Sequence, residues 1–439
     1  MKTTKTMWVM LIALLTATSC SETETEIDPE PGSGGQVALG ITPNLKVDAG
    51  TKAETKSVVS GEAITYPVDQ YASSDYAPGL GVWVTNSGAT GWYTPDGTEY
   101  TGHHVWYMGD ETGKNWISVK DKKDTYKLTK EVPYYLTKTV GKVYAYYPYD
   151  ATLTTTLSSI SSESDLKIPV AVLASGEIDA STDNAKRRWV NGKWSPVSNK
   201  TPENLSLSTE KDYLYFAATE GRYVNNGRAD GQTPVTPDAD PDNNNADNPG
   251  YKINLDMHHA MAMISFRVYD GGHLSDNDVK FTKFEVKNHT GGTNLFKTGN
   301  GKMALKDGAI TETSTTTGMA RTITNYILMR QIEEGGTEGV HAFIAAGSGS
   351  SAIKGTFVSR TVSAVIYPIE SFGDNEIDVE ITLQEGSKTA VVYPITLPGN
   401  SWDAGSNYIY TFSAGRNKLT IMDVTVEAWA ESEQEEIPL

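Results

Sequence analysis

Short runs in which apolar and polar residues alternate, separated by turn residues, most restrict what this chain can fold into. The clearest run is Glu376–Leu383 (EIDVEITL), where every second residue is Ile, Val or Leu and the residues between are Asp, Glu or Thr. This period of two is typical of a strand with one buried face. Tyrosine (23 residues), threonine, valine and glycine are abundant, which favours strands and turns over helices. The sequence therefore predicts an all-β chain.

The first such run, Val37–Val47, carries its apolar side chains on one face. They occupy the odd positions Val37, Leu39, Ile41, Leu45 and Val47. Pro43 interrupts the run, and because proline has no N–H to donate, it suits an edge strand or a kink. The loop that follows, Asp48–Gly61, contains Lys52 and Lys56. A trypsin-like protease that cut after either lysine would detach this strand from the rest of the chain.

Two strand-rich parts flank a stretch of different character, Asn225–Gly250. It has almost no apolar residues and many Pro, Asp, Asn and Gly, which is typical of a linker or a long exposed loop. We therefore predict an N-terminal domain at 37–228, a linker or long loop at 229–250 and a C-terminal domain at 251–439. Both parts look like small β-sandwiches, without an exact internal repeat.

The second part opens with Ile253–Val268, which is apolar on both faces of a strand. We predict one central strand that is covered on both sides. The last predicted strand, Leu419–Trp429, precedes the acidic stretch Glu431–Glu436.

Six of the nine tryptophans lie between Trp83 and Trp194. On an exposed face they could stack on sugars, but aromatic side chains also fill much of an all-β core, and we favour that interpretation. Asn191-Gly192 predicts a type I′ hairpin turn, which would place Trp189 opposite Trp194.

The N-terminal stretch Met1–Glu26 has the composition of a secretory signal. A charged start precedes the apolar run Met7–Leu15, which is too short to span a bilayer, and small residues then lead to Cys20. Cys20 is the only cysteine, so the chain forms no intramolecular disulfide. Its position resembles the lipobox of bacterial lipoproteins, in which this cysteine becomes the lipid-modified first residue. We expect a signal peptide at 1–19 and lipidation at Cys20.

An acidic, flexible tether at 20–36 follows the cysteine. Its acidic residues resemble the surface-export signal of outer-membrane lipoproteins in some Gram-negative bacteria, and a merely solvated tether is the alternative. A soluble secreted protein with a chance cysteine is the alternative to lipidation.

Charge and motifs argue against several classes of function. The net charge of −18 makes nucleic acid an unsuitable partner, because phosphates are neutralised by Lys and Arg. We find no Walker phosphate loop, no His-Glu-x-x-His and no nucleophile elbow, and we expect neither an enzyme nor a cofactor. Neighbours in a strand point to opposite faces, so neither His103-His104 nor His258-His259 can chelate one metal ion.

Asp238-Ala239-Asp240-Pro241-Asp242 looks like the start of a calcium loop. The pattern then fails, because Asn243 stands where the glycine of the sharp turn belongs and Pro249 where the bidentate Glu belongs. A solvated acidic linker is the preferred interpretation, and weak calcium binding stays open.

Several stretches together resemble the fimbrillin-like family, the subunits of type V pili. They are the lipobox around Cys20, Val143–Tyr149 (VYAYYPY), Leu255–Ile264, and Trp402–Tyr410 (WDAGSNYIY) with the strand that ends at Trp429. The resemblance implies two tandem transthyretin-like β-sandwiches and a lipoprotein precursor carried to the outer membrane. It also implies that a trypsin-like protease removes the first strand, and that a strand of another subunit fills the groove. The family's cleavage residue is often Arg, whereas Lys52 and Lys56 are the candidates here.

We therefore interpret the chain as a structural pilus subunit for adhesion, whose partners are other pilus subunits. The replacement strand would come from the C-terminal run of a neighbour, with Leu419, Ile421, Val424 and Val426 as its apolar residues. The alternative is a monomeric surface lipoprotein of the same fold that binds a glycan or a host ligand.

Lipidation can be tested directly at Cys20. Cys20→Ala should leave the protein soluble or held as an uncleaved precursor, because no other cysteine can take the lipid. Metabolic labelling with a fatty acid measures this, and undiminished label in the variant would refute the assignment.

Overall fold

A computed structural model describes the protein at residues 36–45, 79–96, 100, 102–109, 116–120, 131–153, 157, 159–180, 187–190, 193–196, 204–205, 210–216, 222–225, 250–270, 274, 279–333, 341–344 and 361–428. Strands joined by turns make up almost all of these residues, with the short 3-10 helix η2 (Glu163–Asp165), so the predicted all-β class is confirmed. Cys20, Lys52, Lys56, Val47 and the centre of the predicted linker lie outside the described residues.

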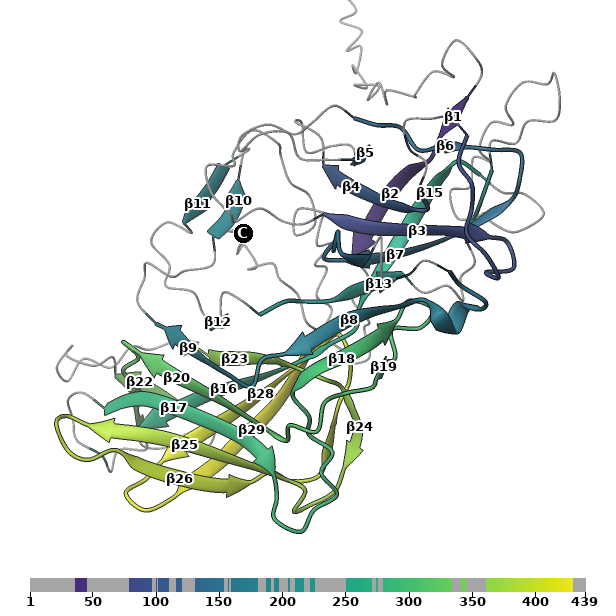
Figure 1. Ribbon diagram of the computed structural model, residues 1–439. Helices are drawn as coiled ribbons and strands as arrows, with labels where there is room; N and C mark the ends of the chain where they lie inside the picture. Colours follow the sequence, from purple (N-terminus) through teal and green to yellow (C-terminus); the bar gives the residue numbers. More distant parts are fainter. Residues whose placement is uncertain are drawn as a thin grey trace, which may run out of the picture.

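One twisted sheet of eight described strands forms the upper part of the molecule in Figure 1. In spatial order its strands are β2 (Gly40–Leu45), β15 (Lys252–His259), β13 (Leu214–Phe216), β7 (Gly141–Tyr147), β3 (Leu80–Asn86), β4 (His104–Gly109) and β5 (Trp116–Val119), with β14 (Tyr223–Val224) also paired to β7.

Two further sheets form the lower part. The first has the order β26 (Val391–Thr396), β25 (Ile377–Glu385), β17 (Val279–Asn288), β20 (Gly318–Thr324) and β9 (Ser175–Asp179). The second has the order β12 (Asn204–Leu205), β23 (Thr361–Ile366), β16 (Ala262–Asp270), β21 (Met329–Glu333) and β22 (His341–Ile344), with β28 (Ser406–Ala414) paired to β16 and β29 (Leu419–Ala428) paired to β28.

The two lower sheets share one apolar core. Phe266 of β16 and Phe284 of β17 meet edge to face across it, with ring centroids 4.8 Å apart. Such an arrangement is typical of the inner faces of a β-sandwich.

Short pairings complete the described strands. They are β1 (Val37–Ala38) with β6 (Tyr135–Leu136), β10 (Arg187–Val190) with β11 (Lys193–Pro196), β18 (Gly299–Ala304) with both β8 (Lys167–Val172) and β19 (Ile310–Thr311), and β24 (Ile369–Phe372) with β27 (Asn400–Trp402). The β10–β11 register confirms the predicted hairpin, with Trp189 opposite Trp194.

The stretch predicted as one central strand, Ile253–Val268, is two strands in different sheets, so that prediction is wrong. β15 buries one face in the upper sheet, whereas β16 is buried on nearly every residue in the lower sandwich. Between them, the Ala260 N–H donates to Tyr213 O, and Met261 O accepts from the Gly405 N–H. Burial alternates along β15 and becomes nearly continuous in β16, but no Gly, Pro, Asn or Asp between Met257 and Ile264 marks the change of sheet.

Strand partners also cross the predicted interdomain boundary in both directions. β8, β9 and β12 precede the predicted linker but pair with β18, β20 and β23 of the lower part. β15 follows the linker but pairs with β2 and β13 of the upper sheet. The limits 37–228 and 251–439 and the two tandem transthyretin-like sandwiches stay predictions, and any division has to accommodate these exchanges.

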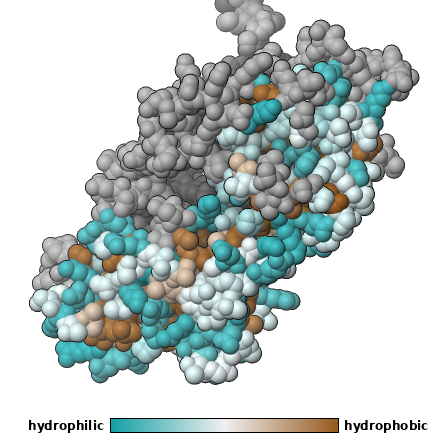
Figure 2. Space-filling view, viewed as in Figure 1, coloured by the Kyte–Doolittle hydropathy of each residue, from teal (hydrophilic) through white to brown (hydrophobic). Residues whose placement is uncertain are grey.

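The two parts are also packed against each other. One face of β3 and β7 contributes Trp83, Tyr144 and Tyr146 to the same cluster of buried residues as the lower core. Figure 2 shows hydrophobic atoms where the upper and lower parts meet. The upper sheet is thus covered on both faces in its centre, since the opposite face packs on a separate cluster.

A buried ion pair ties the segment before β13 to the lower sandwich. The guanidinium of Arg321 in β20 is fully buried and donates to Glu210 Oε1 at 2.6 Å and to Leu173 O at 2.8 Å. The second carboxylate oxygen of Glu210 accepts from the Val365 N–H in β23 at 3.2 Å. The Glu210 carboxylate therefore links the segment that leads into β13 with both lower sheets.

Removing one partner of this pair should be costly. Glu210→Ala leaves the Arg321 charge buried without its carboxylate, and we expect a loss of about 3–5 kcal/mol in the free energy of unfolding. Denaturant unfolding measures it. Glu312→Ala, which removes an exposed partner of Lys302 and Lys167, is the control and should lower the free energy of unfolding far less, because solvent screens exposed ion pairs. Equal effects of the two substitutions would contradict the structural role of Glu210.

Candidate functional site: the first strand and its groove

The first strand lies at the edge of the upper sheet. β2 runs parallel to β15, with Gly40 opposite Lys252 and Thr42 opposite Asn254. Just before it, β1 pairs antiparallel with β6, with Val37 opposite Leu136. An edge position agrees with Pro43, because an edge strand leaves one row of backbone groups outside the ladder.

The side chains of this strand are buried on one face. Val37, Leu39 and Ile41 are only 5%, 3% and 6% exposed. Leu39 and Ile41 belong to the upper core, where they share a cluster with Leu136, Phe216, Ile253, Leu255 and Met257. Full burial of such a side chain is worth roughly 1.5–3 kcal/mol, so these residues stabilise the sheet edge strongly. Leu45 is part of β2, and Val47 lies outside the described residues.

Three hydrogen bonds hold the backbone of the strand where β1 passes into β2. The Leu39 N–H donates to Tyr134 O and the Gly40 N–H donates to Tyr251 O, both at 2.8 Å. The hydroxyl of Tyr107 in β4 donates to Leu39 O at 2.7 Å. Burial raises the pKa of the Tyr107 phenol well above its ordinary value, so the hydroxyl keeps the proton that it donates.

Sequence reasoning found the strand but not these three tyrosines. Tyr107 takes part through its hydroxyl, whereas Tyr134 and Tyr251 take part through their backbone carbonyls. A phenol that donates to a backbone carbonyl has no sequence pattern of its own, since its partner is 68 residues away in the chain.

The predicted exchange strand is also an edge strand. Among the described residues, β29 pairs only with β28. Leu419 is buried, whereas Ile421, Val424 and Val426 are half-buried against the lower core. The first strand and the predicted exchange strand thus lie in different sheets of the same chain, and the structure does not bring them together.

A β-bulge interrupts β29. Phe412 lies opposite Ile421 and Thr411 lies opposite Asp423, so Met422 has no residue opposite it in β28. A one-residue bulge reverses the alternation of side chains, which is why Ile421 and Val424 both face the core although one number is odd and the other even. Met422 itself is 36% exposed.

Tryptophans of the first half are engaged in packing where the structure describes them. Trp83 is fully buried and Trp106 is 7% exposed. Trp83 stacks on the His104 ring with centroids 4.1 Å apart, and Trp92 stacks on the His103 ring at 3.9 Å. His104 Nε2 lies 2.9 Å from the Tyr146 hydroxyl, and burial lowers the pKa of His104 to about 3. Both histidine rings are therefore engaged in packing, and the buried His104 stays neutral at physiological pH.

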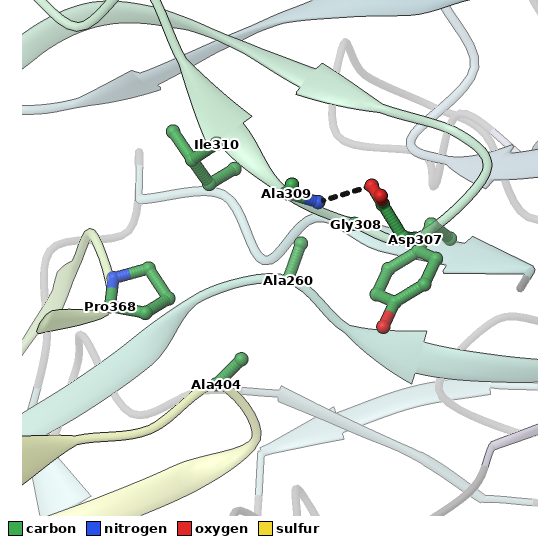
Figure 3. A pocket seen from close by; sticks show the side chains of 8 residues that line it. Ala260, Asp307, Gly308, Ala309, Ile310, Pro368 and Ala404 are labelled. Atoms are coloured by element: carbon green, nitrogen blue, oxygen red, sulfur yellow. Dashed lines mark hydrogen bonds between the residues drawn. The ribbon is translucent and has the colours of Figure 1, made fainter. Parts of the chain in front are cut away.

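A cavity of about 240 Å³ lies between the upper and lower parts (Figure 3). Ala260, Ile310, Pro368 and Ala404 point toward it, and the one carboxylate in its wall, Asp307, accepts a hydrogen bond from the Ala309 N–H of its own turn. A Cβ added at Gly308 would lie 2.1 Å from the ring of Tyr215, so this ring packs directly on the glycine backbone. This wall provides apolar contact, not a set of groups for proton transfer or metal binding.

Within the described ranges, no group of three His, Cys, Asp or Glu side chains is placed to hold a metal ion. The same part of the chain contains no helix of the length and apolar character needed to cross a membrane.

Residues 239–429 match the family model described as fimbrillin-like. A search of curated proteins finds no match. The match confirms the resemblance predicted from the sequence and supports a role in a pilus or in adhesion at the cell surface. It also points to a structural protein rather than an enzyme.

Two solved structures are similar over most of their length. A fimbrial protein from Bacteroides vulgatus has 12% sequence identity and a TM-score of 0.44, covering 90% of this chain and 100% of that one. The tip fimbrial protein Mfa3 from Porphyromonas gingivalis, with a C-terminal truncation, has 10% identity and a TM-score of 0.30, covering 80% of this chain and 93% of that one. Since both TM-scores are below 0.5, the assignment rests on the family match.

The contribution of the first strand to stability can be measured at Leu39. Leu39→Ala should lower the free energy of unfolding by about 2–5 kcal/mol, because it removes a buried side chain from the upper core. Thr42→Ala, an exposed position on the opposite face of the same strand, is the matched control and should change little. If both variants unfold at the wild-type denaturant midpoint, the strand is not a stable part of the sheet in solution.

Proposed function

We propose that this chain is a structural subunit of a cell-surface pilus, exported as a lipoprotein and assembled by proteolytic release of its first strand and strand exchange between subunits. Its partners would be other pilus subunits, the outer membrane through a lipid on Cys20, and a trypsin-like processing protease. The filament would serve in adhesion. It is supported by the family match and by the seating of Val37–Leu45 in the upper sheet.

One observation carries the mechanism: a strand with three strongly buried side chains occupies an edge and is separated from β3 by a stretch that contains Lys52 and Lys56. Cleavage there would disconnect the strand without cutting any described element. Release would break the hydrogen bonds to Tyr134, Tyr251 and Tyr107 and would uncover the apolar side chains beneath Leu39 and Ile41. Another strand can restore both kinds of contact, which is the physical basis of strand addition at an open edge.

The competing function, a monomeric lipoprotein that binds a glycan, has less support. It needs exposed aromatic side chains on which sugars can stack, whereas Trp83 and Trp106 are buried and stacked on other rings. Glycan binding by a monomer would also leave the first strand, seated at the edge of the upper sheet, without a role.

Processing can be tested at the two lysines. Lys52→Ala combined with Lys56→Ala should keep the first strand in place and the protein monomeric, because the proposed cleavage sites are gone. The measurements are the N-terminal sequence of the mature protein and its filament content by electron microscopy. Lys138→Ala, at an exposed lysine between β6 and β7, is the control and should be processed and assembled normally.

Two results would count against the proposal in different ways. Filaments built from protein that still begins at Cys20 would show that the strand need not leave. Normal processing of the double variant would place the cut elsewhere in the chain.

A further inference from the structure

The groove imposes a definite pattern on any strand that replaces the first one. Val37, Leu39, Ile41 and Pro43 are buried, so a replacement needs four apolar side chains at alternate positions. Between them, Ala38 and Gly40 are half-buried and Thr42 is exposed, so polar residues are tolerated there. The replacement must also run parallel to β15, as β2 does.

The bulge in β29 means that its core-facing residues cannot all enter this groove. Leu419 and Ile421 precede Met422 and have odd numbers, whereas Val424 and Val426 follow it and have even numbers. Without β28 opposite, nothing holds the bulge, and a regular extended strand presents only one of these two sets to one face. The groove therefore selects between them.

The position of Asp423 in β29 decides which of the two sets can face the groove. If Leu419 and Ile421 occupied two successive buried sites, Asp423 would occupy the next one. Placing a carboxylate in an apolar core without a partner is strongly unfavourable. The even-numbered frame presents Met422, Val424, Val426 and Ala428 to the groove, and it turns Asp423, Thr425 and Glu427 outward.

The register within the even-numbered frame follows from side-chain size. With Met422 at the site of Val37, Val424 and Val426 occupy the sites of Leu39 and Ile41, and Ala428 occupies that of Pro43. Moving the strand by two residues in one direction puts polar Thr420 into the Val37 site. Moving it the other way puts Ala428 into the Ile41 site, which leaves a cavity.

We infer that Met422, Val424, Val426 and Ala428 of one copy occupy the sites of Val37, Leu39, Ile41 and Pro43 in the next copy. This inference rests on the proposed function and specifies its partner strand residue by residue. It accounts for Met422, whose large apolar side chain is 36% exposed in the unassembled chain but would be buried beside Leu136 after exchange.

Backbone contacts of the groove fit the same register. The Val424 N–H and C=O would take over the hydrogen bonds that Leu39 makes to Tyr134 O and to the Tyr107 hydroxyl. The Thr425 N–H would replace that of Gly40. A Cβ at position 40 meets Lys252 Cγ at 3.2 Å, a contact that the flexible lysine can relieve, so threonine is accommodated there.

The register predicts one cross-link. Thr42 lies opposite Asn254, so Glu427 of the incoming strand would lie opposite Asn254, within the distance that a disulfide spans. Two full-length chains are prepared with Cys20→Ser and different tags, one carrying Asn254→Cys and the other Glu427→Cys. They are processed with the trypsin-like protease, mixed, allowed to assemble and compared on non-reducing gels, where a mixed dimer is the expected result.

Two matched partners for the Asn254→Cys chain test the other registers. Met422→Cys would lie opposite Asn254 if Leu419 and Ile421 filled the sites of Leu39 and Ile41, and Thr425→Cys would do so if the even frame were displaced by two residues so that Thr420 entered the Val37 site. A dimer with either partner in place of Glu427→Cys would overturn the register while leaving strand exchange intact. Filaments without any of these dimers also overturn it, whereas filaments that retain residues 20–45 overturn the proposed function itself.

Discussion

The continuous backbone that passes from β15 into β16 is the constraint on which the rest of the structure depends. β15 lies between the first strand and β13 in the upper sheet, and after Ala260 and Met261 the same backbone becomes β16, near the centre of a lower sheet. A strand whose neighbours are missing leaves backbone donors and acceptors without partners, at a cost comparable to that of lost hydrogen bonds. The strand that β2 pairs with is therefore joined directly to the core of the lower part.

This continuity explains why the upper and lower parts are tied at several points. Glu210 reaches Arg321 and Val365 in the lower sandwich just before the chain enters β13, and Tyr215 of β13 packs on Gly308. With no disulfide available, these buried polar and aromatic contacts fix how the upper sheet sits on the lower core. An edge strand can then leave without loss of the whole fold, because the contacts between the parts involve β13 and its approach rather than β2.

Sequence patterns predicted the strands well wherever one face alone is buried. Ile377, Val379, Ile381 and Leu383 alternate strictly, and all four are buried in β25. The same rule located the first strand and the buried side chains of Val37, Leu39 and Ile41. It failed at Ile253–Val268, because a strand buried on one face and a strand buried on both faces follow each other there without a turn residue between them.

Long-range partners could not be predicted from alternation. The local sequence does not show that β8 and β9 pair with strands more than a hundred residues later, because alternation indicates only which face of a strand is apolar. The bulge at Met422 is likewise a property of the pair β28–β29, and the sequence alone presented Leu419, Ile421, Val424 and Val426 as one set. The groove could be anticipated from the strand that fills it, but the Tyr107 hydroxyl that donates to Leu39 O could not.

A comparison of burial would give the proposed strand exchange its direction. In the unassembled chain, Val424 and Val426 are half-buried at the edge of the lower sandwich, whereas the sites of Leu39 and Ile41 are almost completely enclosed. Moving the two valines into those sites would exchange one row of backbone hydrogen bonds for another and remove additional apolar surface from water, which is favourable in proportion to its area. While the first strand is covalently attached, it competes for the same sites at a high local concentration. Cleavage would abolish that advantage, so the covalent cut, rather than a difference in strand affinity, would set when exchange begins.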